Sequence, residues 1–226
     1  MRLLKFIFIT LILLSFFGCK KKQVDELQFE KDVLNNVFVE IVDSIYMDRR
    51  VMLPPPTPRI DFKTNKEDTI GFHKKLREYW RDRDSIKNDK TRILIGVYDR
   101  VTKISPQENE MIIKEINLSE YTYDISKETD EFDLDLAQFK DNKKFNFQYL
   151  SKFPPVNVWD LNDKKSSMPV GAVGISRIQF DKTKTRGILS ASASCGGGRC
   201  GRGFVIIIEN KSGKWKIEKI IHTWVS

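Results

Sequence analysis

The sequence predicts an α+β protein in which N-terminal helices pack on a C-terminal antiparallel meander sheet. Apolar residues recur at helical spacing near the N-terminus, and a helix-start motif with a proline lies at residues 105–108. The last third alternates strand-like runs with turn residues. Helices that precede strands in this way are typical of α+β domains. The 226 residues, 40% of them hydrophobic, suffice for one sizeable domain.

The first predicted helix is amphipathic and runs from about Val24 to about Arg50. Its apolar positions are Leu27, Leu34, Phe38, Ile41 and Ile45. A coiled coil would have only about three heptads here, so packing on the protein's own sheet is favoured. The Pro-rich segment at residues 53–58 then forbids helix and favours a stiff, extended connector over a ligand for an aromatic groove.

Two capping boxes predict the next helices. Thr64 and Glu67 have the spacing of the first box, and the helix it opens carries Phe72, Leu76, Tyr79, Trp80 and Ile86. Ser105 and Glu108 form the second box, with Pro106 at the first helical position. This second motif is the strongest helix-start signal in the chain.

The strands are predicted from β-branched and aromatic runs. Two lie at residues 91–101 and 145–149, and four more at residues 172–180, 186–194, 204–209 and 214–225. Turn residues at 181–184 and 210–213 separate neighbouring runs. The last four runs therefore predict a four-stranded antiparallel meander, whereas residues 118–142 are ambiguous.

The N-terminus has the pattern of an export signal. Arg2 and Lys5 precede an apolar run at residues 6–17, which is too short to span a membrane. The run ends at Gly18-Cys19, which resembles the lipobox of bacterial lipoproteins. The resemblance implies cleavage after residue 18 and acylation, including palmitate, of Cys19. The alternative is an uncleaved anchor with an incidental cysteine.

This resemblance implies three parts of the chain. Residues 1–18 are the signal peptide, residues 19–58 a lipid-anchored amphipathic helix with its Pro-rich connector, and residues 59–226 the α+β domain. Lys20, Lys21 and Lys22 each add about 1 kcal/mol of attraction to an anionic leaflet. Because no Asp follows Cys19, lipoprotein sorting rules imply the outer membrane, and we expect the protein to face the periplasm.

The C-terminal part carries a second resemblance. Residues 195–201 form a Cys-Gly-rich-Cys loop, and Gly213-Lys214-Trp215-Lys216 follows in the next turn and strand. Together with the signal peptide, this tail resembles a group of small, uncharacterised lipoproteins of Gram-negative bacteria, which has no activity to transfer. The helix-and-sheet layout is also similar to a cystatin-like or nuclear-transport-factor-like roll. Such folds host unrelated functions.

The cysteines predict a disulfide. With Cys19 acylated, Cys195 and Cys200 remain as a pair in an oxidising compartment, at the junction of two predicted strands. A redox role is disfavoured because the spacing is not Cys-x-x-Cys. Arg199 and Arg202 lie in or beside this glycine-rich loop and form the candidate binding loop, since arginine suits carboxylate or phosphate. The alternative is that the loop is only a stapled turn.

Few residues indicate a metal, cofactor or catalytic site. His73 and His222 are far apart in the sequence and from the cysteine pair, so we expect no metal. The glycines at 196–201 are not followed by the helix that a dinucleotide-binding site needs, so we expect no cofactor. Two pairs of carboxylates are candidate catalytic acids: Asp133 and Asp135, and Asp160 and Asp163. Nothing in the sequence distinguishes them from surface acids, so no catalytic residue is assigned.

These observations predict a lipid-anchored envelope protein that acts as a non-catalytic binding module, for example of the inhibitor or immunity type. The alternative is a periplasmic hydrolase that uses an Asp or His222 in a sheet pocket. The expected partners are the membrane, through the N-terminal lipid, and an envelope protein or an anionic envelope polymer. Basic and acidic residues are interspersed, so the net charge of +8 does not predict nucleic-acid binding.

Overall fold

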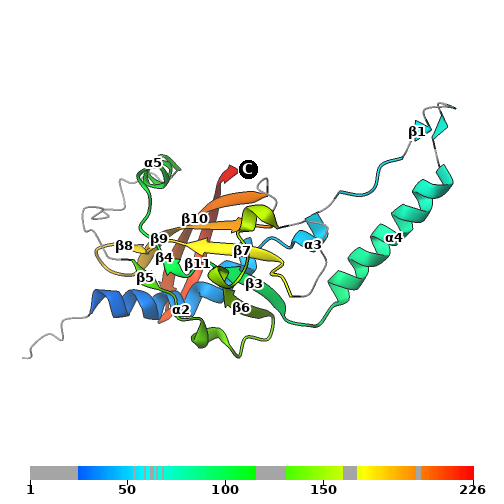
Figure 1. The fold of residues 1–226 in the computed structure, drawn as a ribbon. Helices are drawn as coiled ribbons and strands as arrows, with labels where there is room; N and C mark the ends of the chain where they lie inside the picture. Colours follow the sequence, from blue (N-terminus) through cyan, green and yellow to red (C-terminus); the bar gives the residue numbers. More distant parts are fainter. Residues whose placement is uncertain are drawn as a thin grey trace, which may run out of the picture. The chain divides into compact units, whose positions relative to one another are not determined.

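The fold is that of a computed structural model (Figure 1). It describes residues 25–52, 54–58, 60–61, 64, 66–67, 69–115, 131–159, 167–196 and 200–226. The chain divides into two compact units, the second of which runs from Asn35 to Ser226. Cys19, Lys20, Lys21, Lys22 and the signal peptide lie outside the described residues. Within the described ranges, no helix has both the length and the apolar composition that crossing a bilayer requires.

Four α-helices lie in the described residues: α2 (Glu26–Ile45), α3 (Arg49–Met52), α4 (Thr69–Asn88) and α5 (Pro106–Glu115). Short 3-10 turns follow as η2 (Leu136–Phe139), η3 (Leu150–Lys152) and η4 (Val156–Val158). The first predicted helix ends at Ile45 rather than near Arg50. Arg49 and Arg50 instead begin the separate helix α3.

The capping box at Ser105 is confirmed. The Glu108 backbone N–H donates to the Ser105 hydroxyl over 3.2 Å, and the Ser105 N–H donates to the Glu108 carboxylate over 2.8 Å. The box predicted at Thr64 is wrong, because Lys66–Glu67 form strand β2 and pair with β1 (Ile60–Asp61). Helix α4 starts only at Thr69, after this small ladder.

In the described residues, the main sheet has seven strands in the order β11-β10-β9-β7-β3-β6, with β8 also paired to β9. The bounds are β3 (Ile93–Val97), β6 (Phe145–Tyr149), β7 (Gly171–Ile175), β8 (Gln179–Phe180), β9 (Arg186–Ser194), β10 (Gly201–Lys211) and β11 (Lys214–Val225). Two further strands, β4 (Arg100–Val101) and β5 (Phe132–Asp133), form a separate pair.

The α+β prediction is confirmed, but the sheet is mixed. Strands β7, β9, β10 and β11 pair antiparallel, as the meander predicted, whereas β3 pairs in parallel with both β6 and β7. The predicted strand at residues 172–180 is two strands, because the chain leaves the ladder at Arg177 and Ile178. The cystatin-like roll stays a prediction.

One face of the sheet carries the larger core. The strand register places Val97, Val173 and Ala193 on one face, and all three are buried. Phe147 of β6 lies on this face and contacts Phe38 of α2, with ring centroids 5.2 Å apart. The second half of α2 therefore packs on this face, as the amphipathic pattern predicted.

Described residues cover the opposite face only in part. Ile112 of α5 packs on Ile188 of β9 and on Val205 and Ile207 of β10. Figure 1 shows α5 on this side of the sheet. Further along β9, the residues on the same face are the small Ser190, Ser192 and Ser194, which lie beyond the apolar cluster of Ile112.

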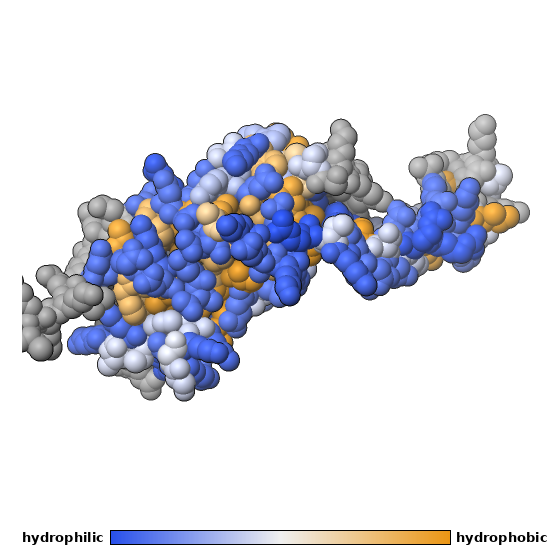
Figure 2. Space-filling model, turned by 90° about the horizontal axis from the view of Figure 1, so that it is seen from below, coloured by the Kyte–Doolittle hydropathy of each residue, from blue (hydrophilic) through white to orange (hydrophobic). Residues whose placement is uncertain are grey.

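Helix α4 contributes no buried residue to the core. Its C-terminal part is tied to α3, because the Arg83 guanidinium donates to the Val51 carbonyl over 2.9 Å and Arg50 lies 3.6 Å from Asp89. Ile70 at the other end of α4 is 85% exposed. Figure 2 shows hydrophobic residues at that end, while hydrophilic residues cover most of the visible face.

The turn between β8 and β9 yields a pH prediction. Burial alone would raise the pKa of Asp181, but hydrogen bonds from Thr183, Arg186 and Thr185 outweigh it and lower the pKa below its usual value. Stability from this carboxylate is thus complete above the unfolded-state pKa and lost as the pH falls through the lower folded-state pKa. Asp181→Asn should lower the unfolding free energy by about 1 kcal/mol near neutral pH, with the difference shrinking in acid.

Urea denaturation at about pH 7 and about pH 3 measures this effect. Asp84→Asn, which changes an exposed carboxylate on α4, is the control and should leave stability unchanged at both values. A destabilisation of Asp181→Asn that is the same at both pH values would contradict the assignment.

Candidate functional site

The predicted disulfide is present. Cys195 and Cys200 are bonded with their Cα atoms 5.4 Å apart, and the Cys195 N–H donates to the Cys200 carbonyl over 3.0 Å. Gly196 within the loop has φ +101°, which a residue with a side chain rarely adopts. The bond closes the connection from β9 to β10.

Of the two arginines of the candidate binding loop, the structure describes only Arg202. Arg199 lies outside the described residues. Arg202 is half-buried, and its register partners Ala193 and Val225 place it on the opposite face from Gly201 and Gly203. Its Nε atom is buried without a hydrogen-bond partner. Arg202 is therefore a partly buried residue of the sheet rather than an exposed residue of the loop.

The other candidates that the structure describes lie apart from one another. His222 is exposed on β11, with its ring 4.9 Å from that of Phe204, and His73 is exposed on α4. Asp133 lies 3.5 Å from Arg100, and Asp135 caps η2 through the Ala137 N–H. Asp160 and Asp163 lie outside the described residues. In the described ranges, no group of three His, Cys, Asp or Glu residues is arranged to hold a metal ion.

The serine-bearing face of the sheet is hollowed into two adjoining cavities of about 510 and about 630 Å³. Tyr98 and Ser192 line both, so we treat them as one groove along β9. The first cavity is also lined by Asp99, Arg100, Thr102, Glu108, Gly174, Ile175, Ser176, Ser190 and Ala191. The second is lined by Leu150, Pro155, Val156, Asn157, Ala172, Ala193, Ser194, Cys200, Gly201, Trp224 and Ser226.

One row of residues crosses the groove. Ser192 of β9 pairs with Gly174 of β7 on one side and with Gly203 of β10 on the other, and Gly203 pairs with Trp224 of β11. Tyr98 follows β3, and its N–H donates to the Val173 carbonyl over 3.0 Å, which places it beside Gly174. The groove therefore has a low floor of serine and glycine between two aromatic residues.

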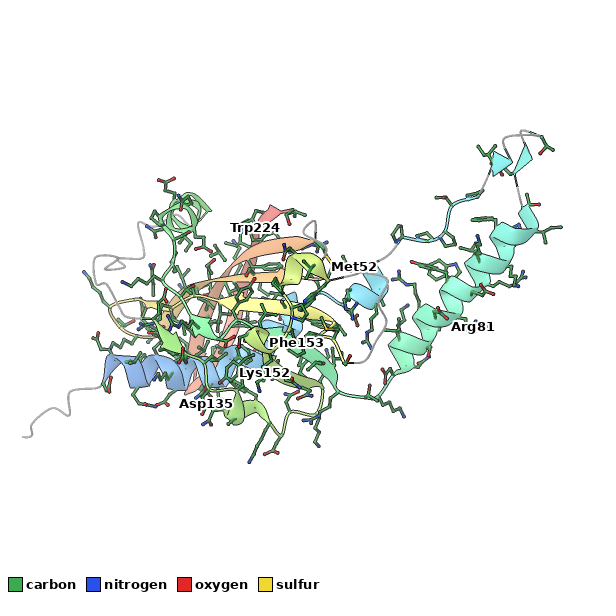
Figure 3. All side chains as sticks on the ribbon, viewed as in Figure 1. Met52, Arg81, Asp135, Lys152, Phe153 and Trp224 are labelled. Carbon is green, nitrogen blue, oxygen red and sulfur yellow. A yellow bond between two sulfur atoms is a disulfide. The ribbon has the colours of Figure 1, made fainter. Side chains whose placement is uncertain are left out.

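The two rings lie over the glycines. Tyr98 Cδ2 is 3.1 Å from the point where a Cβ atom would stand on Gly174, and Trp224 occupies the same space above Gly203. Figure 3 labels Trp224 near the end of β11. Covering a glycine backbone is one role for such a ring. Tyr98 and Trp224 nevertheless remain 48% and 41% exposed, so each leaves apolar ring surface open to a ligand.

The charged groups around the groove are already engaged. The Ser190 hydroxyl donates to the Glu108 carboxylate over 2.6 Å, and the Ser151 hydroxyl donates to Asp99 over 2.6 Å. The hydroxyl of Ser192, in contrast, makes no hydrogen bond with another described residue. The free polar groups of the floor are thus uncharged.

Sequence reasoning did not find this groove. The alternation of Ser190, Ser192 and Ser194 with Leu189, Ala191 and Ala193 is visible in the sequence and marks a strand with one polar face. Tyr98 and Trp224 carry no signal that would join them to this strand, because the pairing that brings them together is long-range.

Comparisons of the chain with family models, with curated proteins and with solved structures found no match. The groove is therefore interpreted from its own chemistry.

Gly203→Ala tests the packing of Trp224. A methyl group at residue 203 would collide with the indole, so the ring must move or the strand must shift, at a cost of roughly 1–3 kcal/mol. The indole N–H resonance of Trp224 should shift in the NMR spectrum. This resonance is identified as the peak that is missing from the spectrum of Trp224→Phe. Ser192→Ala is the control, because it removes an oxygen without adding volume. An unshifted indole signal in Gly203→Ala would contradict the described packing.

Proposed function

We propose that this protein is a non-catalytic binding module of the bacterial cell envelope, anchored by lipid on Cys19. The groove between Tyr98 and Trp224 is its binding face. The observation that carries the proposal is this hollow, which leaves two aromatic rings partly exposed on either side of an uncommitted serine hydroxyl. Concave sites lined by aromatic surface and a few polar groups are typical of ligand binding.

The chemistry of the groove favours binding over hydrolysis. A serine nucleophile needs a base within hydrogen-bond reach that can take its proton. Glu108 contacts Ser190, but the same carboxylate caps α5 through the Ser105 N–H. The hydrolase alternative uses an Asp or His222. His222 does not line either cavity, and Asp99, the aspartate among the described lining residues, accepts hydrogen bonds from the Ser151 N–H and hydroxyl. These contacts support a structural role for Glu108.

Support for the lipid anchor comes from the sequence. The apolar run at residues 6–17 ends at Gly18-Cys19, and Lys20, Lys21 and Lys22 follow. Acyl chains with an adjacent cationic cluster give the two signals that stable membrane attachment requires. An outer-membrane position facing the periplasm would bring the groove within reach of envelope proteins and polymers, and an inhibitor or immunity-type role fits a module without catalysis.

Cys19→Ala tests the anchor. The variant should lose labelling by radioactive palmitate, and the protein should move from the membrane to the soluble fraction or accumulate as an unprocessed precursor. Cys195→Ala is the matched control, because it removes another cysteine and should leave both labelling and membrane attachment intact. Unchanged fractionation of Cys19→Ala with the normal mature mass would contradict lipid anchoring.

Cross-linking of the native lipoprotein in its own envelope tests the binding role. A partner captured by the wild type should be lost from Ser192→Phe, which fills the groove floor, and retained by Trp80→Ala on α4. Turnover of an envelope substrate by the purified protein would instead favour the hydrolase. Capture that Ser192→Phe leaves unchanged would place the binding face elsewhere.

A further inference from the structure

We infer that the groove binds an uncharged carbohydrate chain, with sugar rings stacked on Tyr98 and Trp224. The inference rests on the proposed function, because it takes the groove as the binding face and names the chemical class of its ligand. Four features of the groove lead to it. The two rings are spaced for a chain of sugars, and free hydrogen-bonding groups lie between and beside them. Carboxylates in the lining disfavour an anionic ligand, and the strands of the floor have no open edge for a peptide.

The two rings are spaced for successive sites on one chain. Gly174 and Gly203 both pair with Ser192, so the rings that cover them stand two strand spacings apart, about 10 Å. Both rings keep exposed apolar surface. The C–H face of a sugar ring is apolar, and an aromatic face attracts its positively polarised hydrogens. An oligosaccharide laid across the row can therefore contact both rings.

Hydrogen-bonding groups without partners lie between and beside the rings. The Ser192 hydroxyl is uncommitted, and the side chains of Thr102 and Asn157 are exposed at the margins of the two cavities. Hydroxyl and amide groups both donate and accept. Sugar hydroxyls do the same, so each can pair here without bringing a charge into the groove.

The charges of the groove disfavour an anionic ligand. Among its described lining residues, the acidic and basic side chains are those of Asp99, Glu108 and Arg100. Arg100 is exposed and lies 3.5 Å from Asp133 and 3.8 Å from Glu131, two carboxylates that would compete with an anionic ligand for it. An anionic polymer would meet two carboxylates and no free cation among these lining residues. The net positive charge of the chain is therefore not concentrated among the described lining residues of the groove.

The floor also disfavours a peptide. Strands β7, β9 and β10 each have neighbours on both sides, so they offer no open edge to which a peptide strand could add. A proline-rich peptide needs aromatic slots with donors for its carbonyls. The indole Nε1 of Trp224 lies against Gly203, where it faces the sheet. A sugar ring can stack on the exposed face of the indole without using its N–H.

Titration calorimetry of the full-length protein tests the inference, in a zwitterionic detergent that has no sugar headgroup. The probes are cellohexaose and chitohexaose, with an oligogalacturonate and a proline-rich peptide as comparators. At least one neutral hexasaccharide should bind with a Kd of about 1 mM or tighter. Tyr98→Ala and Trp224→Ala should each weaken binding about tenfold, whereas Trp80→Ala, an exposed tryptophan on α4, should not.

Circular dichroism shows whether each variant is folded. If Trp224→Ala unfolds, Trp224→Leu, which keeps apolar bulk over Gly203 but removes the ring, replaces it and should show the same loss. Failure of both neutral hexasaccharides to bind, or binding that the loss of either ring leaves unchanged, overturns the inference. Groove-dependent binding of only the anionic or the peptide probe also overturns it. In each case, loss of the cross-linked envelope partner in Ser192→Phe would leave the proposed function standing.

Discussion

The pairing of β9 with β10 is the constraint on which the rest of the structure depends. With Ser192 opposite Gly203, the apolar residues Leu189, Ala191 and Ala193 face the larger core and the serines face the groove. A slip of one residue would reverse both sets. Two devices hold the register: the disulfide Cys195–Cys200 at one end, and the isoleucine cluster around Ile112 toward the other.

Helix α5 determines where the groove begins. Ile112 of α5 packs on the first part of β9. The capping residue Glu108 accepts a hydrogen bond from Ser190, the first serine of the floor. The same carboxylate thus starts the helix and fixes it to the sheet. Beyond Ser190 the described lining of the groove comes from loops, 3-10 turns and strand ends rather than from an α-helix, and the small residues of β9 form the hollow there.

The sequence correctly predicted features that depend on residues close together in the chain. The capping box at Ser105, strand β9 and the disulfide each follow from residues close together in the chain. The capping box predicted at Thr64 was wrong because its glutamate, Glu67, pairs with Ile60 in a strand ladder. The parallel pairing of β3 was missed because no local pattern marks a partner about fifty residues away.

The groove illustrates the same limit at the level of function. The glycine-rich loop closed by the disulfide predicted a binding face at Arg199 and Arg202. Gly203 instead makes room for Trp224, and strand alternation turns Arg202 to the other face. The alternation Gly201-Arg202-Gly203 is readable in the sequence. The convergence of Tyr98 and Trp224 on Ser192 is not, because it depends on the order of five strands.

In-cell photo-cross-linking tests the central claim that this groove is the binding face. A photoreactive phenylalanine replaces Tyr98 in one strain and Trp80, the exposed tryptophan of α4, in another. The account predicts an adduct with an envelope component from residue 98 and none from residue 80. An adduct from residue 80 alone would contradict it.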